Sequence, residues 1–179
     1  EENTVDPETG LTLGKVLEQA QEQNLDLMEM EEGETASFIA TYASTTTDVS
    51  VTRGSCYYYS DYDLGSSLTY KYTVSFNNVT ATAYCIQPSK SSPGDGVFKI
   101  TRLGDGKKLA KVCYYGTKAS GVNGFFKTEH PDFSAGKQFV ITHLAVSYAS
   151  GSDDAFSGAN ATGQALAMEL YNYCMAQPE

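Results

Sequence analysis

Residues 70–88 read YKYTVSFNNVTATAYCIQP. Apolar and polar residues alternate in the first half of this stretch, which is typical of a half-buried strand. Asn77-Asn78 can adopt positive φ and suits a tight hairpin turn. The return strand is predicted over residues 79–87, with Cys85 and Gln87 on one face, and a proline ends it. The stretch therefore predicts a β-hairpin that carries a cysteine at its end.

The remaining pattern places strands before helices. Short β-prone runs predict strands at residues 38–42, 49–52 and 97–103. Helical spacing then predicts a helix that begins near residue 109 and two longer helices at residues 134–151 and 160–175. A Gly-rich connection is expected over residues 116–132. This order predicts a β-rich α+β domain rather than a parallel α/β sheet.

Charge divides the chain into two parts. Residues 1–34 hold eleven acidic residues and one basic residue, so they carry the whole net charge of −10, and residues 35–179 are neutral. We predict that 1–34 is an acidic N-terminal arm with a short helix at 12–25 and an irregular end at 26–34, and that 35–179 is one domain. Without a basic patch or an apolar run of about 20 residues, nucleic acid and membrane insertion are not expected.

Four cysteines, Cys56, Cys85, Cys113 and Cys174, form no CxxC pair, which disfavours zinc and thioredoxin-like sites. Their disulfide pairing is left open, although Cys113 and Cys174 are predicted to be helix-borne core residues. Asp153 and Asp154 lack the alternating spacing of a calcium loop. We therefore expect no metal and no cofactor. The Ser-, Thr- and Tyr-rich body is typical of an extracellular β-rich protein.

Cys85 and His143 are the residues whose chemistry is most informative. Cys85 is either a buried core cysteine or a reactive thiol at the sheet edge. His143 falls within an amphipathic helical pattern, where histidine is usually a core residue held by one hydrogen bond. Together they could form a thiol–imidazole pair, and we expect them in direct contact, through a neutral hydrogen bond or an ion pair. A cysteine protease is disfavoured, because Cys85 is predicted on a strand rather than at a helix start.

Two motifs resemble those of the thioester domains found at the exposed N-terminal ends of Gram-positive wall-anchored adhesins. Residues 83–88, AYCIQP, are similar to the aromatic–Cys–apolar motif of the family's thioester cysteine, and residues 141–146, ITHLAV, are similar to its Thr-Gln-x-Ala helix. The resemblance covers residue 35 to the end. It implies a sandwich-like sheet region with a helical lobe, and covalent attachment in which a Cys–Gln thioester acylates an amine on a host molecule.

The family's glutamine position is His143 here, and imidazole has no acyl carbon. The resemblance therefore implies a Cys85–His143 site in place of Cys–Gln, and we expect no thioester to a glutamine. A branch of Firmicute surface proteins that includes VaFE-repeat proteins has a similar Thr-His-x-Ala pattern. Gln87 and Gln138 lie near the motifs without matching the glutamine position. The predicted catalytic residues are Cys85 and His143, and the predicted binding residues are Tyr84, Gln87 and Thr142.

The expected function is that of an extracellular, monomeric adhesin domain, anchored to the cell wall through a following part of the protein, whose partner is a host surface protein or glycan. Two alternatives stay open. A non-covalent binding module would use the tyrosine cluster at 57–62, since tyrosines give rigid amphipathic contact area, although such a cluster more often reflects strand packing. A thiol enzyme would use the Cys–His pair for transfer or hydrolysis.

Deleting residues 1–10 is expected to leave the melting temperature of the protein unchanged. These residues are acidic and have no apolar periodicity, so they offer no surface to bury against the domain. Thermal unfolding of the full and shortened chains, followed by circular dichroism, measures this. A fall of several degrees would mean that the segment is docked.

Overall fold

The computed structural model describes residues 48–76, 79–101, 107–118 and 124–178, with two short backbone segments at 28–30 and 37–38. The predicted arm helix at 12–25 lies outside the described residues. The strands are β1 (Met28–Met30), β2 (Ser37–Phe38), β3 (Asp48–Tyr58), β4 (Leu68–Phe76), β5 (Val79–Ala83) and β6 (Gly96–Thr101). The helical elements are η1 (Tyr59–Tyr62), α2 (Lys107–Cys113), η2 (Tyr114–Lys118), α3 (Phe125–Glu129), α4 (Ala135–Ala149) and α5 (Ala161–Ala176). The α+β prediction is confirmed.

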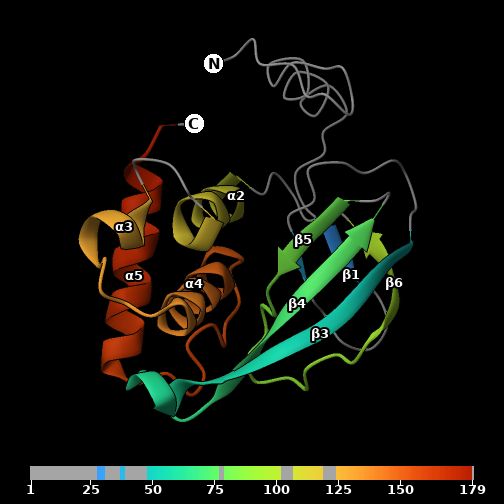
Figure 1. Cartoon of the computed structure of the whole chain (residues 1–179), viewed down its shortest axis with the longest axis horizontal. Helices are drawn as coiled ribbons and strands as arrows, with labels where there is room; N and C mark the ends of the chain where they lie inside the picture. The colour runs from blue at the N-terminus through green and yellow to red at the C-terminus, as the bar shows by residue number, and fades with distance from the viewer. Residues whose placement is uncertain are drawn as a thin grey trace.

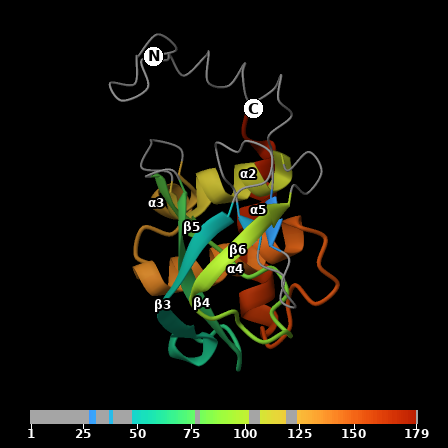
Figure 2. The same cartoon turned by 90° about the vertical axis from the view of Figure 1, so that its right-hand side faces the viewer.

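The strands form one six-stranded antiparallel sheet in the order β2-β1-β6-β3-β4-β5. The predicted hairpin is confirmed, because β4 and β5 pair from Phe76–Val79 to Tyr72–Ala83. The two strands at the ends of this order, β2 and β5, also come close to each other, so the sheet is curled. Figure 1 shows the sheet beside a separate helical lobe, and Figure 2 shows the same two parts from the side.

Three segments differ from the sequence prediction. The return strand ends at Ala83 rather than Gln87, because its pairing with β4 ends at Tyr72–Ala83 and the chain then bends at Ile86. Met28–Met30, predicted as irregular, forms β1 and pairs with β6. The Gly-rich connection contains α3, which buries Phe125 and Phe126 and packs them edge to face at 5.0 Å.

Helices α4 and α5 begin where the sequence predicts. The Ser134 side chain accepts a hydrogen bond from the Lys137 amide at 3.3 Å, and Asn160 accepts one from Gly163 at 2.9 Å, so each helix has an N-cap. The amphipathic pattern predicted for α4 is wrong, since every residue from 139 to 147 is buried. The reason is that α2 and α5 pack against α4 within the lobe (Figure 1), as η2 does. In addition, the Ser147 side chain hydrogen-bonds to the chain that leaves β5. None of the described helices is long and apolar enough to cross a membrane.

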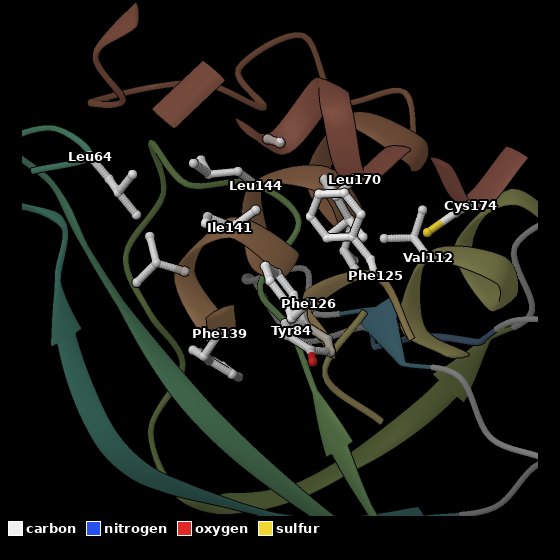
Figure 3. Close-up of a cluster of buried hydrophobic side chains, with 14 of the residues drawn as sticks. Leu64, Tyr84, Val112, Phe125, Phe126, Phe139, Ile141, Leu144, Leu170 and Cys174 are labelled. Carbon is white, nitrogen blue, oxygen red and sulfur yellow. The ribbon is translucent and has the colours of Figure 1, made fainter. Parts of the chain in front are cut away.

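Two hydrophobic cores lie side by side. The larger core fills the helical lobe around α4, with Leu144, Phe125 and Leu170 among its fully buried side chains (Figure 3). The smaller core lies against the sheet and consists of Val49, Val51, Tyr72, Val74, Ala83 and Cys85. The chain that leaves β5 contributes to both cores, and this fixes the position of Cys85.

Replacing Gly163 by alanine is expected to lower the melting temperature, although alanine is the better helix former by about 1 kcal/mol. A Cβ atom at this position would lie 2.5 Å from the Leu64 carbonyl oxygen, so α5 or the η1–β4 loop would have to move. Gly94→Ala is the matched control, since nothing lies within 4 Å of its added Cβ. An unchanged or raised melting temperature for Gly163→Ala would contradict this packing of α5.

Candidate functional site

Cys85 lies at the seam between the two cores. Ala83 and Cys85 pack into the sheet core, whereas Tyr84 and Ile86 pack into the core of the helical lobe. Consecutive side chains therefore point to opposite sides of the backbone, as in an extended chain, but both sides are covered. Cys85 is only 5% exposed as a result.

Helix α4 is tied to this seam by a hydrogen bond. The Ser147 hydroxyl donates to the Cys85 carbonyl oxygen at 3.2 Å, and the serine is fully buried. His143 precedes Ser147 by four residues, so the two side chains lie on the same face of the helix. That face is therefore directed toward the region of Cys85.

His143 is buried and neutral. Its Nδ1 lies 3.3 Å from the Thr69 hydroxyl of β4, and its Nε2 has no hydrogen-bond partner among the described residues. Burial lowers the pKa of the ring to about 4, so the imidazole is uncharged near neutral pH. The Nδ1 atom thus pairs with Thr69, and neutrality of the ring disfavours the ion-pair form of a Cys85–His143 contact. Direct contact between the Cys85 and His143 side chains stays a prediction.

Tyr59 is a member of this site that the sequence did not single out. Its side chain is fully buried, its ring centroid lies 6.2 Å from that of His143, and its hydroxyl has no partner among the described residues. Burial raises the pKa of the phenol, and the Cys85 thiol adds to the rise. The sequence did not distinguish Tyr59 from the neighbouring tyrosines, which could be either surface residues or residues packed in the core.

Two of the three predicted binding residues make contacts within the helical lobe. Tyr84 stacks on Phe139 at 5.2 Å in the lobe core, and the Thr142 hydroxyl donates to the Gln138 carbonyl of its own helix at 2.8 Å. Gln87, by contrast, is next to Cys85. The thiol donates to the Gln87 backbone carbonyl at 3.6 Å, and the side-chain Oε1 of Gln87 is buried with no described partner.

Asp154 accepts hydrogen bonds that hold the turn after Gln87 in place. This carboxylate accepts hydrogen bonds from the Ser89 amide at 2.9 Å and from the hydroxyls of Ser89 and Ser152. Burial raises the pKa of Asp154, but these hydrogen bonds outweigh burial and hold it below its ordinary value. Asp154 thus links the loop after α4 to the segment after Cys85, a role that the sequence interpretation as a solvated loop missed.

None of the four cysteines forms a disulfide. Cys113 ends α2 and is half-buried, while Cys174 in α5 is fully buried, and burial raises its pKa to about 12. Their predicted place on helices is confirmed. Across the described residues, no group of three or more His, Cys, Asp or Glu side chains is arranged to hold a metal ion.

Comparison with known proteins gives one match. The family model described as "Thioester domain" matches residues 48–179, which include the whole site. No curated protein and no solved structure matches the chain.

The free energy of unfolding is expected to fall as the pH falls from 7 to 4. In this range the unfolded chain protonates His143 near its ordinary pKa of 6.5, whereas the folded chain does so only near 4. The lost stability is on the order of 3 kcal/mol, most of it is lost by pH 4, and the loss levels off only below the folded pKa. Urea unfolding at several pH values measures it.

The matched variants for this titration are His143→Gln and His130→Gln. The first removes the buried imidazole and is expected to flatten the pH dependence. The second changes a partly exposed ring that pairs with Glu169 at 3.2 Å, and is expected to keep the dependence. Equal pH dependence in His143→Gln and the unchanged protein would show that His143 is not buried as a neutral ring.

Proposed function

This chain belongs to the thioester domain family, and we propose that it is the covalent-attachment domain of a cell-surface adhesin, with Cys85 as its reactive residue. The observation that carries the proposal is the buried, neutral His143. Its Nε2 has no hydrogen-bond partner in the described part of the chain. The ring lies on the same face of α4 as Ser147, which hydrogen-bonds to the Cys85 carbonyl. A buried nitrogen without a partner costs about 1–3 kcal/mol, so its retention favours a chemical use.

Cys85 supplies the sulfur and His143 acts as the base. In a thioester domain, the cysteine sulfur carries an acyl group until an amine attacks the acyl carbon, which forms an amide and releases the thiol. Each step moves a proton between sulfur and nitrogen, and a neutral imidazole can accept it and return it. A base at Nε2 requires the tautomer with the proton on Nδ1, in which the Thr69 hydroxyl accepts the ring hydrogen bond and orients the ring.

His143 cannot supply the acyl carbon, so the roles of the site residues differ from those in the Cys–Gln pair that the resemblance implies. The proposed site is a thiol with a neighbouring base, and the acyl carbon comes from another residue. The reaction happens once per chain, because the amide that forms keeps the partner bound to the acyl residue and leaves the sulfur without an acyl group. This favours attachment over turnover, and a thiol enzyme is the less favoured proposal.

We place the domain outside the cell, on the surface of a Gram-positive bacterium, in a protein anchored to the wall. The partner is a host surface protein or a glycan that carries a primary amine. Family membership and the Ser-, Thr- and Tyr-rich body support this setting. The non-covalent alternative is weakened because three of the clustered tyrosines pack inward: Tyr59 is fully buried, Tyr57 packs on Phe139 at 4.8 Å, and Tyr62 is packed against the lobe core.

The full chain, incubated with a biotin-tagged primary alkylamine, is expected to acquire at most one tag that survives denaturation. Cys85→Ser is expected to acquire none, because an oxygen ester does not form in place of the thioester. Cys56→Ser, a change at a half-buried cysteine of β3, is the control that keeps the tag. Intact mass spectrometry and streptavidin blotting measure the product. Absence of any Cys85-dependent tag would contradict the proposal, and repeated turnover of a chromogenic ester would favour the thiol enzyme.

A further inference from the structure

We propose that Gln87 supplies the acyl carbon, so that the thioester joins the Cys85 sulfur to Cδ of the glutamine two residues later. This inference rests on the proposed covalent function of Cys85 and names the second residue of the same site. It departs from the position implied by the family resemblance, which is occupied by His143. It also replaces, for this one residue, the sequence-based expectation that no thioester to a glutamine forms.

The backbone after β5 brings the two residues together. The Cys85 thiol donates to the Gln87 carbonyl at 3.6 Å, and the same carbonyl accepts the Lys90 amide at 3.0 Å, which closes a turn. Pro88 restricts Gln87 to an extended conformation. The chain bends at Ile86, between the two residues, and the thiol–carbonyl hydrogen bond places the backbone of Gln87 beside the Cys85 sulfur.

Among the described glutamines, only Gln87 has a side-chain oxygen that is buried without a hydrogen-bond partner. Gln138, Gln164 and Gln177 each donate from Nε2 to a backbone carbonyl, at 2.7, 3.2 and 3.3 Å. These three amides are held by the folded backbone. The Oε1 atom of Gln87 is buried and has no hydrogen-bond partner among the described residues. A buried amide oxygen without a partner is costly in an ordinary structural glutamine, which favours a chemical role for Gln87.

Neighbouring groups can carry the reaction without an oxidant or a cofactor. The sulfur attacks Cδ of Gln87, His143 takes the thiol proton and delivers it to the departing nitrogen, and ammonia leaves as the C–S bond is completed. The Tyr59 hydroxyl, which is buried without a described partner, can donate to the oxygen that becomes negative at Cδ. An amine of the partner later attacks the same carbon, forms an amide to Gln87, and returns the proton to the sulfur.

The inference also explains why His143 can replace glutamine in the α4 motif. With the acyl carbon on the Cys85 side of the site, the helix needs to contribute only a base. Thr69 holds one nitrogen of the ring and leaves the other available for the proton. The acyl donor and the base then come from different elements, the turn after β5 and helix α4.

The test is intact mass spectrometry of the full chain, followed by fragment mapping and by treatment with methylamine. The freshly purified protein is expected to be lighter than its sequence by one ammonia, with the link mapped to Cys85 and Gln87. Methylamine is expected to add to Gln87 and to release one thiol per chain. Gln87→Glu is the informative variant, because it keeps the shape of the side chain but has no amide nitrogen to lose. It is expected to show neither the mass loss nor methylamine addition, while Gln138→Ala keeps both.

Three outcomes would overturn the inference. If methylamine adds in a Cys85-dependent way but maps to a residue other than Gln87, the acyl donor is wrong while the proposed function stands. If no Cys85-dependent mass loss or addition occurs in any form, both fail. If the mass loss persists in Cys85→Ser, it comes from a succinimide, for which the Asn123-Gly124 sequence is suited, and the thioester is absent. Melting curves of Gln87→Glu confirm that the variant is folded.

Discussion

Complete burial of α4 between Phe139 and Ser147 is the constraint on which the site depends. A helix buried on all sides must find partners inside the protein for each polar side chain that it carries. Thr142 turns back to its own helix, Ser147 reaches the Cys85 carbonyl, and His143 reaches Thr69 with one nitrogen only. The same burial removes the charge from the imidazole. One packing arrangement thus fixes the position of the cysteine backbone and the protonation state of the histidine.

The seam between the two cores extends this constraint to the cysteine. Residues 83–86 alternate between the sheet core and the lobe core, so Cys85 cannot rotate toward solvent without exposing Tyr84 and Ile86. The hydrogen bonds from Ser89 to Asp154 hold the turn after Gln87 against the loop that follows α4. A thiol held in this way reacts with groups that the fold places beside it, and it is shielded from unspecific oxidation. These are suitable conditions for the proposed thioester, which would have to last until a partner arrives.

The sequence predicted the parts of the fold that depend on local pattern. Alternation around Asn77-Asn78 located the β4–β5 hairpin, and helical spacing over residues 134–151 and 160–175 located α4 and α5. It missed α3, because the many glycines of that segment conceal a short helix held by the buried Phe125 and Phe126. Cys85 and His143 could be identified from their motifs. Their partners could not, because the contact of Thr69 with His143 spans 74 residues and the contact of Ser147 with Cys85 spans 62. The unpartnered atoms of Tyr59 and Gln87 are likewise features of packing.

The most direct test of a covalent site built on Cys85 is an experimental electron-density map of the intact chain. We expect continuous density from the Cys85 sulfur to the end of the Gln87 side chain, with the His143 Nε2 and the Tyr59 hydroxyl turned toward that bond. A Gln87 amide that is separate from the sulfur, together with a His143 ring that faces away from Cys85, would contradict it.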